Sequence, residues 1–316
     1  MKVHRDIDSL PEFKNAVITI GTFDGVHTGH LQIIRQLKDE ATKIGGETVI
    51  ITFHPHPRMV IQPSTSSSKP GILLLNTLDE KIALLEKQCI DHLVIVPFDD
   101  KFSDQSADVY IKEFLTAKFH PHTIIIGYDH HFGKGRKGNY KLLEQYGPIF
   151  NYQVKEIPEH VLNHVAISST KIREALLSSN LGDANEYLGY EYFFSGQVIE
   201  GDKLGRTLGY PTINLKINDE HKLIPGNGVY AVHLKCDQVN PETLQGMMNI
   251  GFRPTVGGTK KVIEVNIFDF NKDVYNQTFT IFLKSYIRPE IKFDGLESLQ
   301  KQLDKDKLNA INILSS

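Results

Sequence analysis

The hydrophobic pattern of this chain of 316 residues changes near residue 190, and that change limits the folds open to it. In the first part, short apolar segments alternate with stretches whose apolar residues recur at helical spacing. The candidate strands are residues 17–21, 47–53, 92–96, 123–127 and 152–156. Strands this apolar, alternating with helices, predict a doubly wound parallel sheet of the α/β class.

The helices of the first part are predicted from their apolar faces. One follows residue 30, a second covers 77–88, a third covers 106–118 and a fourth precedes residue 180. The residues expected to face the core in the first and fourth helices are Leu31, Ile34, Leu37 and Ala41, and Ile172, Ala175, Leu176 and Leu177. The serine-rich segment 60–72 is interpreted as a mobile surface loop, either a plain connection or a lid.

After residue 190 the chain reads as strands without intervening helices, which predicts a six-stranded antiparallel β-barrel. The expected strands are Phe193–Glu200, Pro211–Ile217, Gly228–Cys236, Leu244–Ile250, Val262–Phe270 and Thr278–Tyr286. A terminal helix near 295–313 is expected to bury Leu296, Leu299, Leu303 and Leu308. The chain is therefore divided into two domains, 1–185 and 186–316.

Composition excludes several classes of protein. A net charge of −3 argues against a nucleic-acid binder, and no apolar run approaches the ~18 residues that cross a bilayer. The first residues lack the apolar core of a signal peptide. Cys89 and Cys236 are too few for a disulfide framework or a metal cluster, and each is expected to pack as a small apolar residue. We expect a cytoplasmic protein with no membrane association and no obligate protein partner.

The strongest chemical signal is the segment Gly-Thr-Phe-Asp-Gly-Val-His-Thr-Gly-His at 21–30, between a strand and a helix. Its glycines, including Gly21 and Gly25, let the backbone approach a ligand, and the helix start favours anions. His27 and His30 can donate hydrogen bonds to a phosphoryl oxygen. The alternative is two ordinary surface histidines beside a tight turn. The combined pattern favours a phosphate site.

This segment resembles the signature of the nucleotidyltransferase superfamily, in its flavin adenylyltransferase branch, which is Rossmann-like. The resemblance extends over Phe53-His54-Pro55-His56-Pro57 and over the glycine-rich, basic segment 127–138, which contains Asp129. Many members have an aromatic residue where this chain has His130. From the residues alone, a ligand-facing loop and a solvated loop are both open for 127–138.

A third stretch, Ile167-Ser168-Ser169-Thr170-Lys171-Ile172-Arg173, has the residues of a helix start. It resembles the family's phosphate-binding motif, although some members have an arginine where this chain has Ala166. The resemblance implies transfer of AMP from ATP to FMN, with FAD and pyrophosphate as products. It implies that His27 and His30 act on the transferred phosphoryl group and that Ser169, Thr170 and Arg173 hold pyrophosphate. Gly21, Phe23, Asp24, Gly25 and Asp129 are the implied ligand-binding residues.

The barrel half has its own glycine-rich segment at 201–214. Thr212 and Asn214 are two residues apart on a strand and so share a face. A hydroxyl and an amide oxygen are hard ligands suited to Mg²⁺ that phosphates also bind. The alternative is a glycine turn that leads into a strand whose polar residues face water.

This half resembles the riboflavin kinase domain, whose Gly-x-x-x-Gly-x-Pro-Thr-x-Asn motif is complete at 205–214. The resemblance implies that Glu264 is the general base for phosphorylation of riboflavin by ATP, giving FMN and ADP. Many members have histidine where this chain has Asn266. The other implied cofactor-binding residues are Gly205, Gly209, Asn249 and Arg288.

Together the two resemblances identify a member of the bifunctional prokaryotic FAD synthetases. Two alternatives stay open at this point: a chain that retains one of the two activities, and a non-catalytic flavin or nucleotide carrier. The implied ligands are riboflavin, FMN, FAD, ATP, ADP and pyrophosphate, with Mg²⁺ as the metal.

Overall fold

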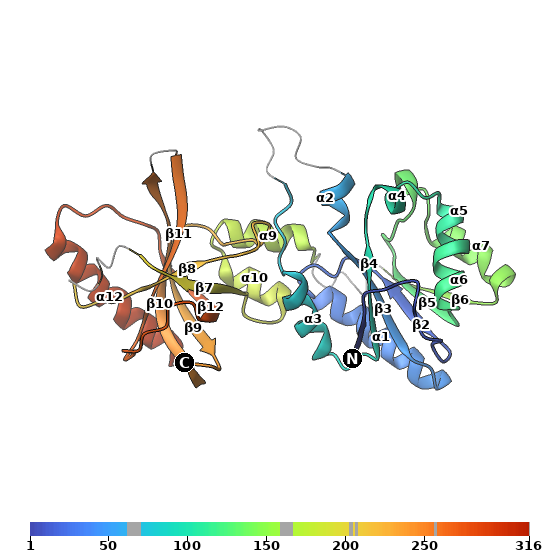
Figure 1. Cartoon of the computed structure of the whole chain (residues 1–316), viewed down its shortest axis with the longest axis horizontal. Helices are drawn as coiled ribbons and strands as arrows, with labels where there is room; N and C mark the ends of the chain where they lie inside the picture. The colour runs from blue at the N-terminus through green and yellow to red at the C-terminus, as the bar shows by residue number, and fades with distance from the viewer. Residues whose placement is uncertain (62–70, 159–166, 202–204, 206–207, 256–257, 316) are drawn as a thin grey trace. The chain divides into compact units, whose positions relative to one another are not determined.

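The structure is a computed structural model that describes residues 1–61, 71–158, 167–201, 205, 208–255 and 258–315. Contacts divide the chain into two compact units, Met1–Ser169 and Thr170–Ser316 (Figure 1). This division lies earlier than the predicted domain boundary at 185/186, which stays a prediction. Most of the serine-rich segment 60–72, interpreted above as a surface loop, lies outside the described residues, as does Ala166.

The first unit is built on a six-stranded, wholly parallel sheet, as predicted. Its spatial order is β1-β4-β3-β2-β5-β6. The strands are β1 (Lys2–His4), β2 (Val17–Ile20), β3 (Thr48–His54), β4 (His92–Pro97), β5 (Thr123–Gly127) and β6 (Gln153–Ile157). Five of them confirm the expected strands, while the short edge strand β1 was not predicted. The chain winds to one side of β2 through β3 and β4, and then to the other side through β5 and β6.

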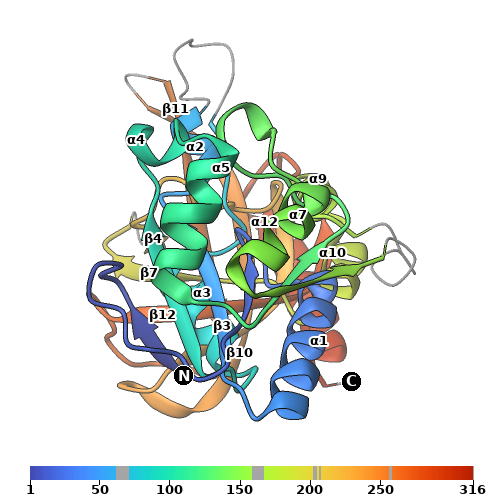
Figure 2. The same cartoon turned by 90° about the vertical axis from the view of Figure 1, so that its right-hand side faces the viewer.

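Helices cover both faces of this sheet. Helices α1 (Thr28–Ile44) and α3 (Leu78–Glu86) lie on one side, and the run from α5 (Ala107–Val109) through the π-helical segment η1 (Tyr110–Thr116) to α6 (Ala117–Phe119) lies on the other (Figures 1 and 2). The remaining described helices are α2 (Pro57–Ile61), α4 (Asp100–Ser103), η2 (Lys134–Arg136) and α7 (Tyr140–Phe150). A parallel sheet covered on both faces buries its central strands completely, which explains their apolar sequences.

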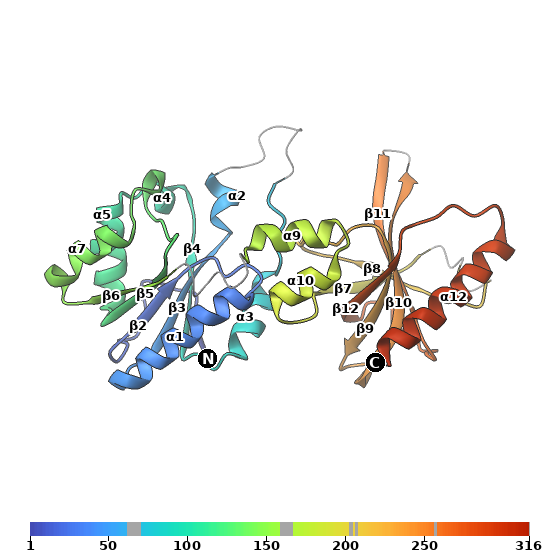
Figure 3. The ribbon, with the colours of Figure 1, turned by 180° about the vertical axis from the view of Figure 1, so that it is seen from behind.

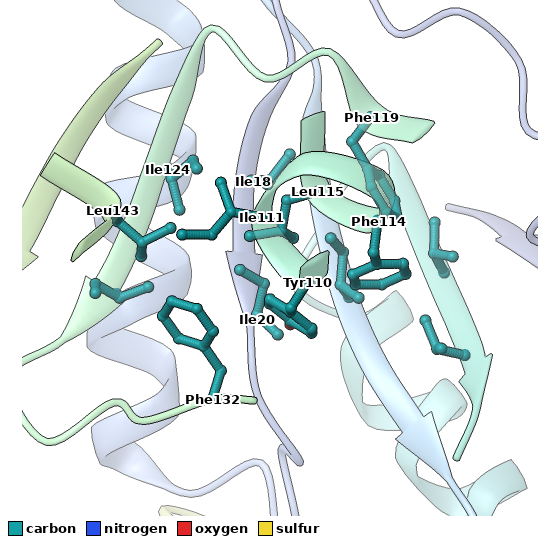
Figure 4. Packing of buried hydrophobic residues seen from close by; sticks show 14 of the residues in the cluster. Ile18, Ile20, Tyr110, Ile111, Phe114, Leu115, Phe119, Ile124, Phe132 and Leu143 are labelled. Carbon is teal, nitrogen blue, oxygen red and sulfur yellow. The ribbon is translucent and has the colours of Figure 1, made fainter. Parts of the chain in front are cut away.

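The core on the η1 side is rich in aromatic residues (Figure 4). Ile18 and Ile20 of β2 and Ile124 of β5 pack under Ile111 and Leu115 of η1. At its edge, the Tyr110 ring stacks on Phe132 with ring centroids 4.9 Å apart. This packing extends the core from the sheet to the loop that follows β5.

The second unit contains the predicted antiparallel barrel, closed in the order β10-β11-β8-β7-β12-β9. Its strands are β7 (Phe193–Ile199), β8 (Ile213–Lys216), β9 (Gly228–Cys236), β10 (Asn240–Thr255), β11 (Gly258–Ile267) and β12 (Thr278–Arg288). Helices α9 (Ser169–Leu177) and α10 (Leu181–Leu188) precede the barrel. Helix α12 (Leu296–Leu314) lies along its wall, where Ala310 and Leu314 pack on Ala231, Met247 and Phe268 (Figure 3).

Some residues predicted to be buried are exposed. Leu177, Leu296 and Leu308 are about half exposed or more, because the buried face of each helix runs through other residues. In α12 that face contains Asp306, Ala310 and Leu314, and Leu308 lies off it. Both cysteines are free; Cys236 is buried as expected, whereas Cys89 is exposed, so the packing predicted for Cys89 was wrong.

Candidate active sites

The turn at 21–27 lies where the winding of the parallel sheet reverses. It follows β2, and the segment 127–138 follows β5, the strand beside β2. Because parallel strands end at the same edge, both segments emerge at the crevice where open α/β sheets bind ligands. The sheet therefore brings two of the predicted ligand segments to one place.

Backbone strain is concentrated in this turn. Phe23, Gly25 and Val26 all have positive φ angles, of 47°, 89° and 37°. Left-handed backbone is costly for non-glycine residues and above all for a β-branched one such as Val26. Such a turn persists only where its surroundings hold it, and strain of this kind is concentrated at functional sites.

The turn places the imidazole rings of His27 and His30 at the start of α1. The rings of His27 and His30 stack with centroids 3.7 Å apart and an interplanar angle of 19°. Gly29 leaves room for this arrangement, since a side-chain carbon there would lie 3.2 Å from the His27 ring. Burial, His27 and Lys81 together hold the pKa of His30 well below its usual range. His30 is therefore neutral at neutral pH and can donate one hydrogen bond.

Three further predicted residues surround the turn. The buried Asp24 carboxylate accepts hydrogen bonds from the backbone N–H groups of Leu75 (3.0 Å) and Asn76 (3.4 Å). The Asp24 carbonyl accepts one from the Ser169 hydroxyl at 2.9 Å. Phe23 is 1% exposed, and its ring lies 5.0 Å from that of His30. Asp24 and Phe23 therefore support the turn from its buried side, and the Ser169 hydroxyl binds its backbone.

Lys81 of α3 is a residue of this site that the sequence did not reveal. Its side chain is buried, and its ammonium donates a hydrogen bond to the Thr22 carbonyl at 2.7 Å. The Thr52 hydroxyl donates to the same carbonyl at 3.1 Å. A lysine in a helix with apolar neighbours is typical of a solvated face, so this burial could not be predicted from the sequence.

The remaining residues predicted for the first site are less closely connected to the turn. Asp129 lies exposed in the segment after β5, and next to it the pKa of His130 is lowered to about 4, chiefly by burial. Thr170 and Arg173 lie on α9, which the contacts assign to the second unit, so their part in this site stays a prediction. His56 is buried, and its Nδ1 accepts a hydrogen bond from the Arg58 backbone.

In the second unit, register brings four predicted residues into one row. Asn214 on β8 lies opposite Glu264 on β11, and Glu264 lies opposite Asn249 on β10. The row continues through Val229 on β9 to Arg288 on β12. Residues opposite one another in antiparallel strands share a face of the sheet. The barrel thus gathers residues that are far apart in the sequence.

Hydrogen bonds link the described residues of the segment before β8. The Gly205 carbonyl accepts hydrogen bonds from the backbone N–H groups of Leu208 (3.2 Å) and Tyr210 (2.9 Å), and Gly209 has a φ of 79°. The amide of Asn266 donates to the Pro211 carbonyl at 2.7 Å, which fixes the residue before Thr212. Thr212 and Asn214 line a pocket with Gly201 and the segment 272–275. A side chain at Gly201 would overlap the Asn214 amide.

Arg288, at the end of the row, is held by α12. Its Nε and Nη2 donate to the Asp306 carboxylate at 2.6 to 3.0 Å, and Nη1 donates to the Pro289 carbonyl. The Asp306 side chain is 1% exposed, so this is a buried ion pair. It fastens α12 to β12 beside the row.

The described part of the chain contains no group of three or more His, Cys, Asp or Glu side chains that could hold a metal by itself. Nor does any helix there have the length and apolar character to cross a membrane.

The family models and the named relatives agree on one family. Residues 10–171 match the family model described as FAD synthetase, and residues 188–314 match the model described as riboflavin kinase. A protein of Listeria monocytogenes named bifunctional riboflavin kinase/FMN adenylyltransferase is 37% identical, over 93% of this chain and 90% of its own length. One of the same name from Haemophilus influenzae is 36% identical, over 93% and 92%. The crystal structure titled macrolide-efflux protein, from Streptococcus pneumoniae, superimposes with a TM-score of 0.87 at 29% identity, covering 98% of both chains.

Proposed function

The chain belongs to the bifunctional riboflavin kinase/FMN adenylyltransferase family, and from this premise we propose which of its residues carry each reaction. The enzyme phosphorylates riboflavin with ATP, giving FMN and ADP, and then joins AMP from a second ATP to FMN, giving FAD and pyrophosphate. We assign adenylyl transfer to residues 1–185 and phosphorylation to residues 186–316. The extents of the two family models support this assignment.

In adenylyl transfer, an oxygen of the FMN phosphate attacks the α-phosphorus of ATP, and the bond to the β-phosphate oxygen breaks. A phosphate monoester is largely ionised at neutral pH, so the nucleophile needs no general base. Catalysis then rests on positioning and on stabilising the charge that develops at the α-phosphate. His27 and His30 supply that stabilisation. Their stacked rings at the strained turn are the observation that carries this assignment.

The other residues predicted for this site are assigned by what they contact. Gly21 and Gly25 shape the turn, and Phe23 and Asp24 hold it from its buried side. Ser169 and Thr170 begin helix α9, and Arg173 lies one turn further along. A helix start followed by an arginine suits a departing pyrophosphate. Asp129, at the end of β5, faces the nucleotide side of the crevice in this proposal.

In phosphorylation, Glu264 accepts the 5′-hydroxyl proton of riboflavin while that oxygen attacks the γ-phosphorus of ATP, and ADP leaves. Its neighbours across the strands, Asn214 and Asn249, can orient the reacting groups. Gly205 and Gly209 let the loop before β8 approach phosphates closely. Arg288, fixed by Asp306, forms the end of the site toward the flavin.

The residues present also fit a magnesium ion. The Thr212 hydroxyl and the Asn214 amide oxygen are hard ligands, and both line one pocket. Together with ATP phosphates they would hold Mg²⁺, which when bound neutralises part of the phosphate charge. The proton of riboflavin is still taken by Glu264.

Complementation between two single-site variants tests this division. Glu264→Gln should make FAD from supplied FMN but not from riboflavin, and His30→Gln should make FMN from riboflavin but little FAD. A mixture of the two should restore FAD synthesis from riboflavin. If either variant lost both reactions while still folded, the assignment of one site to each half would be wrong.

A further inference from the structure

The burial of Lys81 has no explanation in the fold alone. The residue lies on α3, whose start is fixed by a capping box between Thr77 and Glu80, and its side chain is 6% exposed. Removing an ammonium from water costs several kcal/mol unless it is well paired. Within the described part of the chain, its one hydrogen-bond acceptor is a neutral group, the Thr22 carbonyl at 2.7 Å. A leucine or methionine would fill this space without that cost.

The position of the Thr22 carbonyl indicates what the charge of Lys81 does. Thr22 immediately precedes Phe23, the first of the residues with positive φ in the strained turn. Asp24, next along the chain, is tied to Leu75 and Asn76, the segment that leads into α3. Helix α3 and the segment before it therefore hold the chain on both sides of Phe23. Lys81 binds the Thr22 carbonyl on one side, and Leu75 and Asn76 bind Asp24 on the other.

We propose that Lys81 is a positioning residue for adenylyl transfer: its buried ammonium, bound to the Thr22 carbonyl, fixes the strained turn from which His27 and His30 extend. This inference rests on the role proposed for the two histidines. Lys81 acts through the turn and is not itself assigned a contact with substrate.

The charge has a second effect on the same site. Lys81 and the stacked His27 both oppose a proton on His30, in addition to burial, and all three lower the pKa of His30. Burial lowers the pKa of Lys81 itself, and Asp24 counters this by favouring the charged ammonium. Removing the charge of Lys81 should therefore raise the pKa of His30 toward its ordinary value. A residue that only filled space would leave that pKa unchanged.

The test uses the full-length enzyme with Lys81→Met, which keeps an unbranched side chain only one atom shorter and removes its charge. FMN adenylyltransferase kcat should fall by a factor of about 30 to 100, as expected for displaced catalytic groups, with KM for FMN and ATP changed by less than about threefold. The pKa of His30, followed by NMR titration of its imidazole ring, should rise, because one of the causes that lower it is removed. Riboflavin kinase activity of the same preparation should be unchanged, and denaturant unfolding of the first unit should match that of the wild type, which shows that this unit is folded. Lys87→Met, at an exposed position just after α3, is the matched control and should change neither activity.

Lys81→Gln provides a second variant should methionine lower the yield of folded protein, and we expect the same loss because its amide is neutral and shorter. A kcat within twofold of wild type in a folded variant, or an unchanged pKa of His30, would overturn the proposal. His30→Gln is measured in parallel. If His30→Gln is inactive while Lys81→Met is normal, only the inference about Lys81 fails; if His30→Gln is also normal, the proposed site fails.

Discussion

Glu264 of β11 lies directly opposite Asn214 of β8 in the antiparallel barrel, although fifty residues separate them in the sequence. The same glutamate is opposite Asn249 on its other side. A carboxylate between two amides on one face of the sheet can accept a proton from a bound hydroxyl while the amides orient its surroundings. This relationship is the basis of the first prediction.

Glu264→Gln should lower riboflavin kinase kcat by about 10²- to 10⁴-fold, the usual contribution of a general base, while FAD formation from supplied FMN continues at the wild-type rate. The substitution keeps the size of the side chain and removes the basic oxygen. Rates of the two half-reactions, measured separately by chromatography of the flavins, check this. Glu242→Gln, on an exposed part of β10, is the control. Retention of kinase turnover would rule out the base.

Asn266→Ala should lower riboflavin kinase kcat by roughly tenfold, because Pro211 loses the hydrogen bond that fixes the residue before Thr212. Adenylyl transfer should be unaffected. Gln197→Ala removes a comparable amide-to-carbonyl bond, to the Asn276 carbonyl on the exposed surface, and should leave both reactions intact. Equal effects of the two substitutions on the kinase reaction would show that Asn266 does not position the loop.

His30→Gln should lower FMN adenylyltransferase kcat by about 10²- to 10³-fold with little change in KM for ATP, because the lost donor acts on charge that develops in the transition state. In the wild type, NMR titration of the His30 ring should give a pKa well below the ordinary value for histidine, because burial, His27 and Lys81 lower it. Steady-state kinetics and this titration test the two statements. His120→Asn, at an exposed histidine outside the predicted ligand segments, is the control. Parallel losses in kcat and in ATP affinity would contradict the assignment.

His130→Phe should make the first unit less sensitive to acid. The pKa of His130 is lowered to about 4, so in the folded protein it stays neutral at a pH where the unfolded chain, with its ordinary pKa, binds a proton. The stability that neutral His130 contributes is thus fully present above about pH 6.5 and is lost as pH falls toward about 4. The loss is about 2 kcal/mol near pH 5.

Urea unfolding of wild type, His130→Phe and the exposed-site control His131→Asn, compared between about pH 7 and about pH 5, measures this effect. Only His130→Phe should flatten the pH dependence of the free energy of unfolding. If the wild type and His130→Phe lose stability in parallel as pH falls, His130 is not the group responsible.

Asp306→Asn should destabilise the second unit by about 3–5 kcal/mol, because it leaves the Arg288 guanidinium largely buried without its counter-charge. The exposed pair Lys301–Glu297, on the same helix, provides the comparison: Glu297→Gln should cost less than about 1 kcal/mol. Denaturant unfolding gives both values. A small effect of Asp306→Asn would mean that solvent reaches Arg288 more readily than its contacts indicate.

The main elements could be predicted because their signals are local. Residues 123–126 are apolar at almost every position, and a segment of that kind between two helices is a buried parallel strand. Strand β1 escaped prediction because Lys2-Val3-His4 is short and mostly exposed. The exposed Leu308 was misjudged because leucine spacing alone does not show which face of a helix the barrel covers.

The sites were predictable in their residues but not in their relationships. The motif at 21–30 identified His27 and His30, yet their stacking depends on a turn that α3 and β3 hold in place. The place of Lys81 in the site could not be predicted from the sequence. Its burial arises from the packing of a helix that lies more than fifty residues after the turn. Likewise, the row from Asn214 to Arg288 depends on register between strands that are distant in the sequence.

The most direct test of the whole account is to follow the flavins over time when the purified protein is given riboflavin, ATP and Mg²⁺. The account predicts that FMN rises first and then declines as FAD accumulates, with ADP and pyrophosphate released. FMN that accumulates without FAD would show that only the kinase reaction is retained. Unchanged riboflavin, with or without FAD formation from supplied FMN, would contradict the role given to the barrel and to Glu264.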